Sequence, residues 1–217
     1  RLHKKFSMIE VIPSVNVRTF REVEEKIRLV EPYVSWCHLD VTDGVFSSHE
    51  TWRNPSDLLA LKTNLNIEVH LMVSEPDRVI DDWLVPQVKR VIVHAEAIKD
   101  FDTILEKCRD RGIELGIAIN PETPVEAFDP YVGKADVFLF LTVPPGPSGN
   151  PMHENTVGKI TSFRKSCPKC IIEVDGGMNS ETGAASVKAG ANFLAAGKYI
   201  FDSWDIQSAV TSLQSIE

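Results

Sequence analysis

The chain has 217 residues, of which 43% are hydrophobic and 25% charged, a balance typical of one globular domain that can bury a full core. Its formal net charge of −8 argues against an extended basic surface, so neither nucleic acid nor an anionic membrane is an expected partner. No segment approaches the roughly 18 consecutive apolar residues of a membrane helix, and residues 1–7 are expected to form an N-terminal extension without a signal-peptide core. We therefore expect one domain over residues 1–217, a cytoplasmic location and a small-molecule partner.

The cysteines give little indication of a metal or redox site. Only Cys167 and Cys170 stand in a Cys-x-x-Cys spacing, and one such pair without a second is a weak zinc signal. Thiols stay reduced in most intracellular compartments. We therefore expect these two residues, like Cys37 and Cys108, to be free thiols.

Short and nearly continuous apolar segments recur along the chain, which is the pattern of strands buried on both faces of a parallel sheet. The sequence predicts eight strands, at residues 8–13, 36–41, 67–72, 90–94, 115–120, 137–143, 171–175 and 192–196.

Amphipathic segments separate these strands. The clearest begins at Thr19, where Phe20, Val23 and Ile27 recur on one helical face. We expect helices at residues 19–30, 76–83, 101–111, 154–166, 180–189 and 204–216, with left-handed glycines at Gly112, Gly133 and Gly190. Eight strands in a chain of this length, with nothing left for a second domain, predict an α/β fold of the (β/α)₈ TIM-barrel type.

Polar residues stand at the ends of several apolar strands, where barrels of this type place their chemistry. The second strand ends in a segment containing His38 and Asp40, which the two-residue period places on one side of the strand. His70 ends the third strand, Asp175 the seventh, and Ser14 the first. These side chains are expected to meet at the mouth of the barrel.

Two imidazoles and two carboxylates at one barrel mouth suit a divalent zinc, iron, manganese or cobalt ion. The alternative is that His38, Asp40, His70 and Asp175 are each an ordinary hydrogen-bonded buried residue, which is common for a single strand histidine. Because all four stand at equivalent strand ends, we favour one metal site.

Glycines after the last two strands predict a phosphate-binding corner. Gly176 and Gly177 follow the seventh strand, and Gly197 and Lys198 follow the eighth, which is the usual phosphate position of this fold. Glycine lets backbone N–H groups approach an anion closely. Lys198 is expected either to contact the phosphate or to extend its stem into solvent.

The segment after the sixth strand, residues 144–151, is rich in proline and glycine and is long for a simple connection. We interpret it as a mobile lid over the site, with an inert surface loop as the alternative. Its residues Gly146, Ser148 and Gly149 are expected to contact the substrate.

Other polar and aromatic residues have ordinary explanations. His94 and Glu96 are expected to be packed, hydrogen-bonded groups, with support of the metal ligands as the alternative. The histidines expected in solvent are His3, His49 and His153, and the tryptophans expected to pack are Trp52, Trp83 and Trp204.

Four motifs resemble the ribulose-phosphate 3-epimerase family over nearly the whole chain. They are His-Leu-Asp-Val-Thr-Asp-Gly at 38–44, Val-His-Leu-Met at 69–72, Asn-Pro-Glu-Thr-Pro at 120–124 and Glu-Val-Asp-Gly-Gly-Met-Asn at 173–179. The resemblance implies that His38, Asp40, His70 and Asp175 bind a metal and that the two aspartates carry protons. It further implies substrate contacts by Ser14 and His70, and phosphate contacts by Gly176, Gly177 and Gly197.

The resemblance implies epimerisation at C3 of D-ribulose 5-phosphate to D-xylulose 5-phosphate, a step of the pentose phosphate pathway, through a metal-stabilised enediolate. One alternative is an allulose 6-phosphate 3-epimerase, and another is a non-catalytic barrel that binds a sugar phosphate. A lyase or decarboxylase barrel is disfavoured because the Asp-x-Lys-x-x-Asp run of such proteins is absent after the third strand. A monomer and a homo-oligomer are both left open.

The chain departs from the family pattern around the pocket. Thr42 stands where methionine is usual, and residues 45–49 and 141–150 differ from the usual strand-two and strand-six motifs. Pro147 replaces an aromatic residue, and Lys198 replaces a small one, commonly serine. The ligand set is retained while the lid and pocket lining change, which predicts a divergent member.

Overall fold

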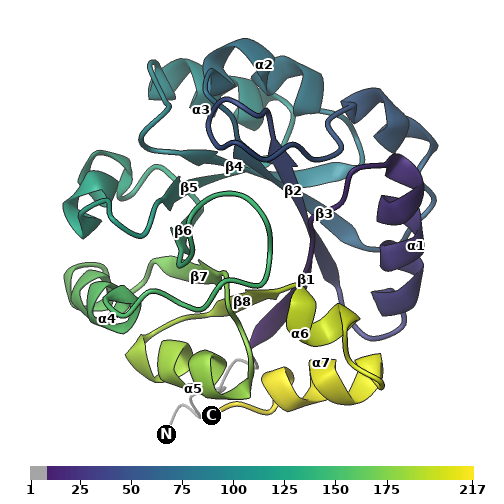
Figure 1. The fold of residues 1–217 in the computed structure, drawn as a ribbon. Coiled ribbons are helices and arrows are strands. Elements are labelled where there is room, and N and C mark those ends of the chain that lie inside the picture. The colour runs from purple at the N-terminus through teal and green to yellow at the C-terminus, as the bar shows by residue number, and fades with distance from the viewer. Residues whose placement is uncertain (1–8) are drawn as a thin grey trace, which may run out of the picture.

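The computed structural model describes residues 9–217. The expected extension at residues 1–7, the exposure of His3 and the start of the first strand at Met8 lie outside the described residues. Eight parallel strands form a closed barrel in which each strand pairs with its neighbours in sequence and β8 returns to β1 (Figure 1). The strands are β1 Glu10–Val15, β2 Trp36–Thr42, β3 Asn66–Met72, β4 Val88–His94, β5 Glu114–Ile119, β6 Val137–Leu141, β7 Ile171–Asp175 and β8 Phe193–Ala196.

Helices surround the barrel as an outer layer (Figure 1). They are α1 Phe20–Val30, η1 Pro55–Ala60, α2 Pro76–Trp83, α3 Phe101–Asp110, η2 Val125–Tyr131, α4 Thr156–Ser166, α5 Ser180–Ala189, α6 Lys198–Phe201 and α7 Ile206–Gln214, where η marks a 3₁₀ helix. Within residues 9–217, no helix has the length and apolar character needed to cross a membrane.

The expected (β/α)₈ barrel is confirmed, and strand boundaries differ from expectation by one or two residues. Three short helices, η1, η2 and α6, were not predicted. Each contains seven residues or fewer, so none repeats an apolar face often enough to show a helical period. Gly112, Gly133 and Gly190 have the expected positive φ angles of 64°, 79° and 123°.

Local signals explain where the first helix begins and which face it buries. Thr19 accepts a hydrogen bond from the backbone N–H of Glu22, whose carboxylate accepts one from the backbone N–H of Thr19. This reciprocal pair satisfies two backbone donors that the first turn would leave free. Val23, Ile27 and Val30 are buried on the face that packs against the barrel.

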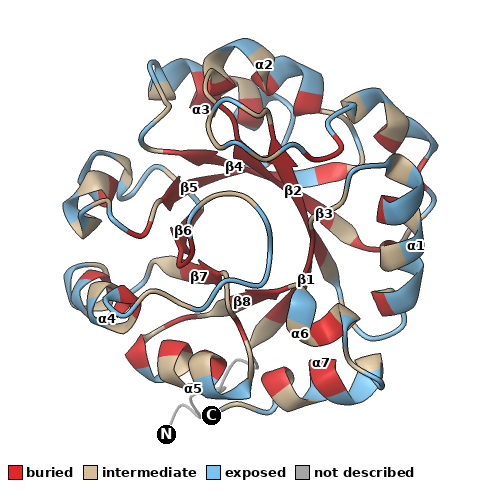
Figure 2. Ribbon diagram, in the orientation of Figure 1, coloured by how far each residue is buried: buried red, intermediate tan, exposed pale blue. Residues whose placement is uncertain are grey.

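Two hydrophobic clusters hold the fold together. The larger one lies between the barrel and its helices, and it accounts for the buried faces of both layers (Figure 2). The smaller one comes from strands β3 to β6 and the segment just after β6. It comprises Met72, Ile92, Ala118, Leu139, Leu141 and Val143. Several inward residues of β2, β3, β4 and β7 are instead polar, and they lie inside the barrel beside this smaller cluster.

Two expectations about individual residues were wrong. Cys167 and Cys170 form a disulfide at the end of α4, whereas Cys37 and Cys108 are free and buried. The two-residue spacing at the helix end brings their Cα atoms within 5.5 Å, a separation that a disulfide can bridge. Trp204 lies fully exposed in the turn between α6 and α7 instead of packing, while Trp52 and Trp83 are buried as expected.

Candidate functional site

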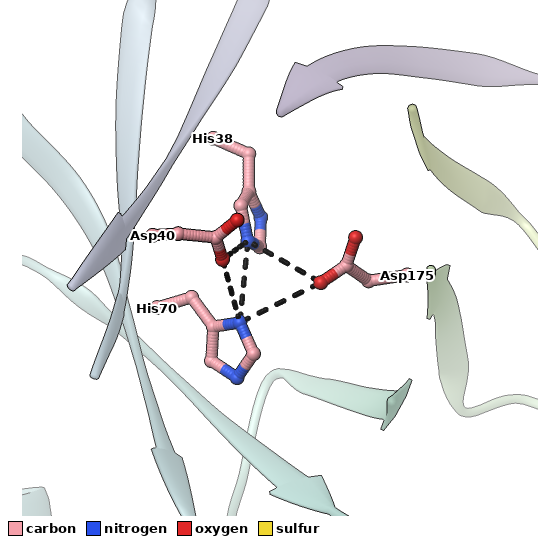
Figure 3. A group of neighbouring side chains, drawn as sticks. All are labelled: His38, Asp40, His70 and Asp175. Carbon is pink, nitrogen blue, oxygen red and sulfur yellow. Dashed lines mark hydrogen bonds and ion pairs between the residues drawn. The ribbon is translucent and has the colours of Figure 1, made fainter. Parts of the chain in front are cut away.

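Strand register brings the predicted polar residues together at the carboxyl ends of the strands. Asp40 on β2 lies opposite His70 on β3, and His38 lies opposite Ser14 on β1. Asp175 ends β7 and approaches from the other side of the barrel mouth (Figure 3). The two-residue alternation of each strand points these side chains inward, as the sequence predicted.

The four expected ligands converge on one point. His38 Nε2 lies 3.1 Å from Asp40 Oδ1 and 3.3 Å from His70 Nδ1, and the last two atoms are 3.3 Å apart. Asp175 Oδ2 lies 3.8 Å from His38 Nε2 and 3.7 Å from His70 Nδ1 (Figure 3). An ion bound tetrahedrally at about 2.0 Å would hold its donors about 3.3 Å apart. The donor atoms and their spacing therefore fit a divalent metal ion.

Glu68 on β3 sets the tautomer of His38. Glu68 Oε1 lies 2.6 Å from His38 Nδ1, so Nδ1–H donates to this carboxylate, and Nε2 is the nitrogen that would bind a metal once it has lost its proton. Arg90 in turn donates to Glu68 through Nη1 at 2.6 Å. Both residues are buried, and together they fix the imidazole in the orientation that a metal requires.

His94 on β4 plays the corresponding part for His70. The Nε2 atoms of the two rings lie 2.9 Å apart, and His94 Nδ1 lies 3.1 Å from Glu96 Oε2. If His94 Nδ1–H donates to Glu96, its Nε2 accepts from His70 Nε2–H, and His70 Nδ1 keeps its lone pair for the metal. His94 is buried and hydrogen-bonded to Glu96, as expected, and its contact with His70 also fits the alternative interpretation, support of a metal ligand.

A polar layer lies directly beneath the site, and we define it as Glu68, Arg90 and Glu173. Arg90 also contacts Glu114 at 2.7 Å and lies over the ring of Trp36. Burial and the charge of Glu68 raise the pKa of Glu173 to about 8, so Glu173 is protonated at neutral pH.

Sequence analysis missed this layer, although a signal was present. Glu68 and Glu173 stand two residues before His70 and Asp175, and Arg90 stands four before His94. The same alternation that paired His38 with Asp40 places them inside the barrel.

The pKa values of the two aspartates are shifted in opposite directions. Burial raises the pKa of Asp175 to about 7, and the negative charge of Asp40 adds to this effect. Burial also opposes ionisation of Asp40, but in the metal-free site the pKa of His38 is held well above its usual range, so its Nε2–H donates to Asp40 and keeps the pKa of this carboxyl well below the usual range. At neutral pH one carboxylate is therefore ionised while the other binds a proton readily.

A pocket opens above these carboxylates. Asp40 and Asp175 line it, whereas the fully buried His38 and His70 lie behind them. The other expected binding residues also line it, namely Ser14, Gly146, Ser148, Gly149, Gly176, Gly177, Gly197 and Lys198.

The glycines of the expected phosphate corner are required by the backbone. Gly176 and Gly177 have φ angles of 108° and 63°, which other residues rarely adopt. A Cβ atom on Gly177 would lie 2.7 Å from the backbone N of Met152, and one on Gly197 would lie 2.9 Å from Ser14 O. The loops after β6 and β7 therefore meet backbone to backbone at Gly177, and the residue after β8 meets the backbone of β1 at Gly197.

Comparison with known proteins agrees with this geometry. The model of the Ribulose-phosphate 3 epimerase family matches residues 10–201. The chain belongs to this family. The epimerase is 32% identical over 215 residues to ribulose-phosphate 3-epimerase of Bacillus subtilis, covering 95% of this chain and 99% of that protein. It is 31% identical over 212 residues to the enzyme of the same name from Schizosaccharomyces pombe, covering 95% and 92%. The chain is thus an isomerase that acts as an epimerase.

Solved structures of other enzymes share its architecture. The epimerase superimposes on 3-hexulose-6-phosphate synthase from Salmonella typhimurium with a TM-score of 0.74 and 12% identity, covering 96% of this chain and 98% of the other. For orotidine 5'-monophosphate decarboxylase from Sulfolobus solfataricus the TM-score is 0.65 at 11% identity, covering 96% and 97%. At such low identity these likenesses show the barrel fold alone.

Of the segments that depart from the family pattern, residues of the 141–150 segment and Lys198 line the epimerase pocket, whereas Thr42 and residues 45–49 do not. Lys198 reaches its rim, where Nζ pairs with Asp202 at 2.6 Å in an exposed position. The head of Lys198 lies in solvent at the edge of the pocket, and its contact with a phosphate stays a prediction.

Two expectations about solvent-exposed histidines were wrong. His49 is half-buried and contacts Asn16, a pocket residue that sequence analysis missed. His153 is also half-buried and lies 3.1 Å from Glu122. Both side chains find polar partners that come from distant parts of the sequence, which no local pattern indicates.

Proposed function

We propose that the epimerase inverts C3 of a pentulose 5-phosphate, converting D-ribulose 5-phosphate to D-xylulose 5-phosphate, with Asp40 and Asp175 as the two proton carriers. The observation that carries the proposal is the pair of carboxylates facing one position from opposite sides of the barrel mouth (Figure 3). An inversion needs a base on one face of the carbon and an acid on the other.

Epimerisation takes two proton steps, one on each face of C3. One of the two carboxylates, Asp40 or Asp175, takes the proton from C3, and the electron pair of the broken C–H bond moves toward the neighbouring carbonyl oxygen. The other carboxyl group returns a proton to the opposite face of C3. The reverse reaction exchanges the two roles.

His38, Asp40, His70 and Asp175 would hold one divalent zinc, iron, manganese or cobalt ion. When bound, the ion supplies a Lewis acid that stabilises negative charge on the substrate oxygens. The contribution of the protein is to fix the donors, through Glu68 behind His38 and His94 behind His70. Ser14 donates to Asp40 Oδ2 at 3.1 Å and thereby orients the carboxylate.

The phosphate would lie against the glycine corner formed by Gly176, Gly177 and Gly197, with the loop residues Gly146, Ser148 and Gly149 above it. Backbone N–H groups can approach an anion closely there because no side chains intervene. Holding the phosphate fixes the distance from this corner to C3, so the binding contacts also orient the reacting carbon.

Solvent exchange tests the proposal. In deuterium oxide, D-ribulose 5-phosphate should gain deuterium at C3 as D-xylulose 5-phosphate forms, because the proton passes through a carboxyl group that exchanges with solvent. Asp175→Asn should stop the reaction in at least one direction, since an amide cannot carry the proton. The exposed Asp110→Asn serves as the matched control and should react like the parent.

Other results would identify an alternative. Binding of pentulose and hexulose phosphates without exchange would indicate a barrel that has lost turnover. Exchange with allulose 6-phosphate alone would assign the enzyme to the six-carbon sugar.

A further inference from the structure

The side chain of Asn16 connects three segments at the pocket mouth. Asn16 follows β1, and its Nδ2 lies 3.3 Å from Asp40 Oδ2 and 3.1 Å from the carbonyl oxygen of Gly146 in the loop after β6. Its Oδ1 lies 2.9 Å from Nε2 of His49, which belongs to the segment after β2. We call these contacts the Asn16 bridge.

Hydrogen-bond chemistry permits one orientation of this amide. The carboxylate of Asp40 and the carbonyl of Gly146 can only accept, so the NH₂ group of Asn16 must face both. Oδ1 then faces His49 and requires a donor, which makes Nε2 of His49 the protonated nitrogen. The amide orientation therefore places the proton of His49 on Nε2, and the bond from His49 helps to hold Asn16 in this orientation.

The two carboxylate oxygens of Asp40 have different partners, and the Asn16 bridge provides one of them. Oδ1 faces His38 Nε2 at 3.1 Å and His70 Nδ1 at 3.3 Å, on the side where the ligands converge. Oδ2 accepts from Ser14 Oγ at 3.1 Å and from Asn16 at 3.3 Å. Rotation of the carboxylate would break contacts on both sides.

The loop at residues 144–150 has few other ties to the barrel. Within residues 9–217, the bond from Asn16 is the one hydrogen bond that joins this loop to another segment. Gly146 has a φ angle of 140°, and a Cβ atom there would lie 3.6 Å from Cβ of His49. The carbonyl of Gly146 is thus presented to Asn16 by a backbone conformation that suits glycine.

We propose that Asn16, oriented by His49, is a positioning residue that fastens the 144–150 loop over the pocket and aligns the carboxylate of Asp40 at the same time. The catalytic part of this inference rests on the proposed function, whereas the fastening of the loop can be measured without turnover. The amide of Asn16 thereby links the position of the 144–150 loop to the orientation of the Asp40 carboxylate.

Nuclear magnetic resonance of the substrate-free protein tests the fastening directly. Asn16→Leu keeps the side-chain size but removes both donors, so the heteronuclear NOE values of the Gly146, Ser148 and Gly149 amides should fall toward those of a flexible loop. His49→Leu should lower them as well, while His49→Gln, which retains a donor, should restore them. The ¹⁵N shifts of His49 should show a proton on Nε2 in the parent and lose this preference in Asn16→Leu. Asn64→Leu, an exposed and distant control, should change none of these signals.

Kinetics test the second half of the inference. Asn16→Leu should lower kcat about tenfold and raise KM about fivefold, the size of effect expected for losing one or two net hydrogen bonds. Metal content should stay unchanged, because Asp40 Oδ1 keeps its neighbours. If His49 acts only through Asn16, His49→Leu should have no further effect in the Asn16→Leu background.

The outcomes separate this inference from the proposed function. Parent-like NOE values in Asn16→Leu would overturn the fastening of the loop, whether or not the protein turns over a sugar phosphate. Additive kinetic effects of the two substitutions would overturn the role given to His49. A parent protein without epimerase activity whose loop still loosens in Asn16→Leu would reject the proposed function and retain the bridge.

Discussion

Asp40 and Asp175 are chemically identical side chains that face one position with opposed affinities for protons. The difference comes from their neighbours, because two imidazoles stabilise the charge of Asp40 whereas Asp175 is buried beside a carboxylate that is already ionised. An ionised Asp175 therefore opposes folding in the absence of a metal. The site gives up stability in order to hold a transferable proton.

Replacing Asp175 should consequently stabilise the metal-free protein. The folded pKa of Asp175 is raised from 3.8 to about 7, so the cost of ionisation is absent below pH 4, grows as the pH rises and is complete above pH 7. It is on the order of 4 kcal/mol at its maximum. Urea unfolding in the presence of a chelator should show Asp175→Asn more stable than the parent at pH 8 and equal to it at pH 4. Equal stability at both pH values would contradict the raised pKa.

Lys198 offers a second prediction at this scale. Its ion pair with Asp202 is exposed, and such pairs add little to stability, so Lys198 can exchange this partner for a phosphate. Lys198→Ser should raise KM for a sugar phosphate several-fold with little change in kcat, and Asp202→Asn, which frees the amine, should leave KM equal or lower it. An unchanged KM in Lys198→Ser would place the amine in solvent during catalysis.

Local sequence patterns predicted the strands of this barrel better than the contacts between its loops. Apolar runs predicted all eight strands, and polar residues at strand ends predicted the four side chains that converge at the barrel mouth, because each strand repeats the same backbone pattern. The contact of Asn16 with Gly146 joins segments 130 residues apart, and no period in the sequence describes it. The layer around Arg90 was within reach of the same alternation, but its charged residues lie one layer below the strand ends.

The pairing of β2 with β3 predicts that Glu68 controls metal affinity. Glu68→Gln retains an acceptor for His38 but loses the charge that orients its ring, so metal affinity measured by calorimetry should fall about 10- to 100-fold. Glu114→Gln is a matched control, because Glu114 also pairs with Arg90 yet does not contact His38. If both variants bind metal like the parent, the tautomer argument is wrong.

The close approach of the loops after β6 and β7 gives a prediction for Gly177. Gly177→Ala combines a φ angle of 63° with a Cβ atom 2.7 Å from backbone, so the loops must separate and KM for the sugar phosphate should rise at least about tenfold. Gly158→Ala, in α4 with open space around it, should instead stabilise the protein by about 0.5–1 kcal/mol. Thermal unfolding and steady-state kinetics of both variants measure these effects.

At the scale of the whole molecule, the convergence of β2, β3 and β7 predicts that metal binding stabilises the entire barrel. A metal at about 100 times its dissociation constant should add about 2.7 kcal/mol, or roughly 5–10 °C in Tm for a chain of this length. Because a ligand must bind without its proton and the pKa of Asp175 is raised to about 7, the gain should be larger at pH 8 than at pH 6. Scanning calorimetry with and without metal at the two pH values measures it, and an equal gain at both would contradict the proposed ligand set.

The polar layer of Glu68, Arg90 and Glu173 also bears on how the barrel closes in the correct alignment. A strand that slides by two residues keeps its inward side chains inward, so hydrophobic alternation does not reject the misaligned sheet. In this chain such a slide on β4 would carry Arg90 away from Glu68 and leave an unpaired charge in the interior, which costs about 3–5 kcal/mol. We expect these residues to destabilise sheets in which a strand is misaligned. The groups that orient the proposed ligands in the folded enzyme therefore also favour the correct strand register during folding.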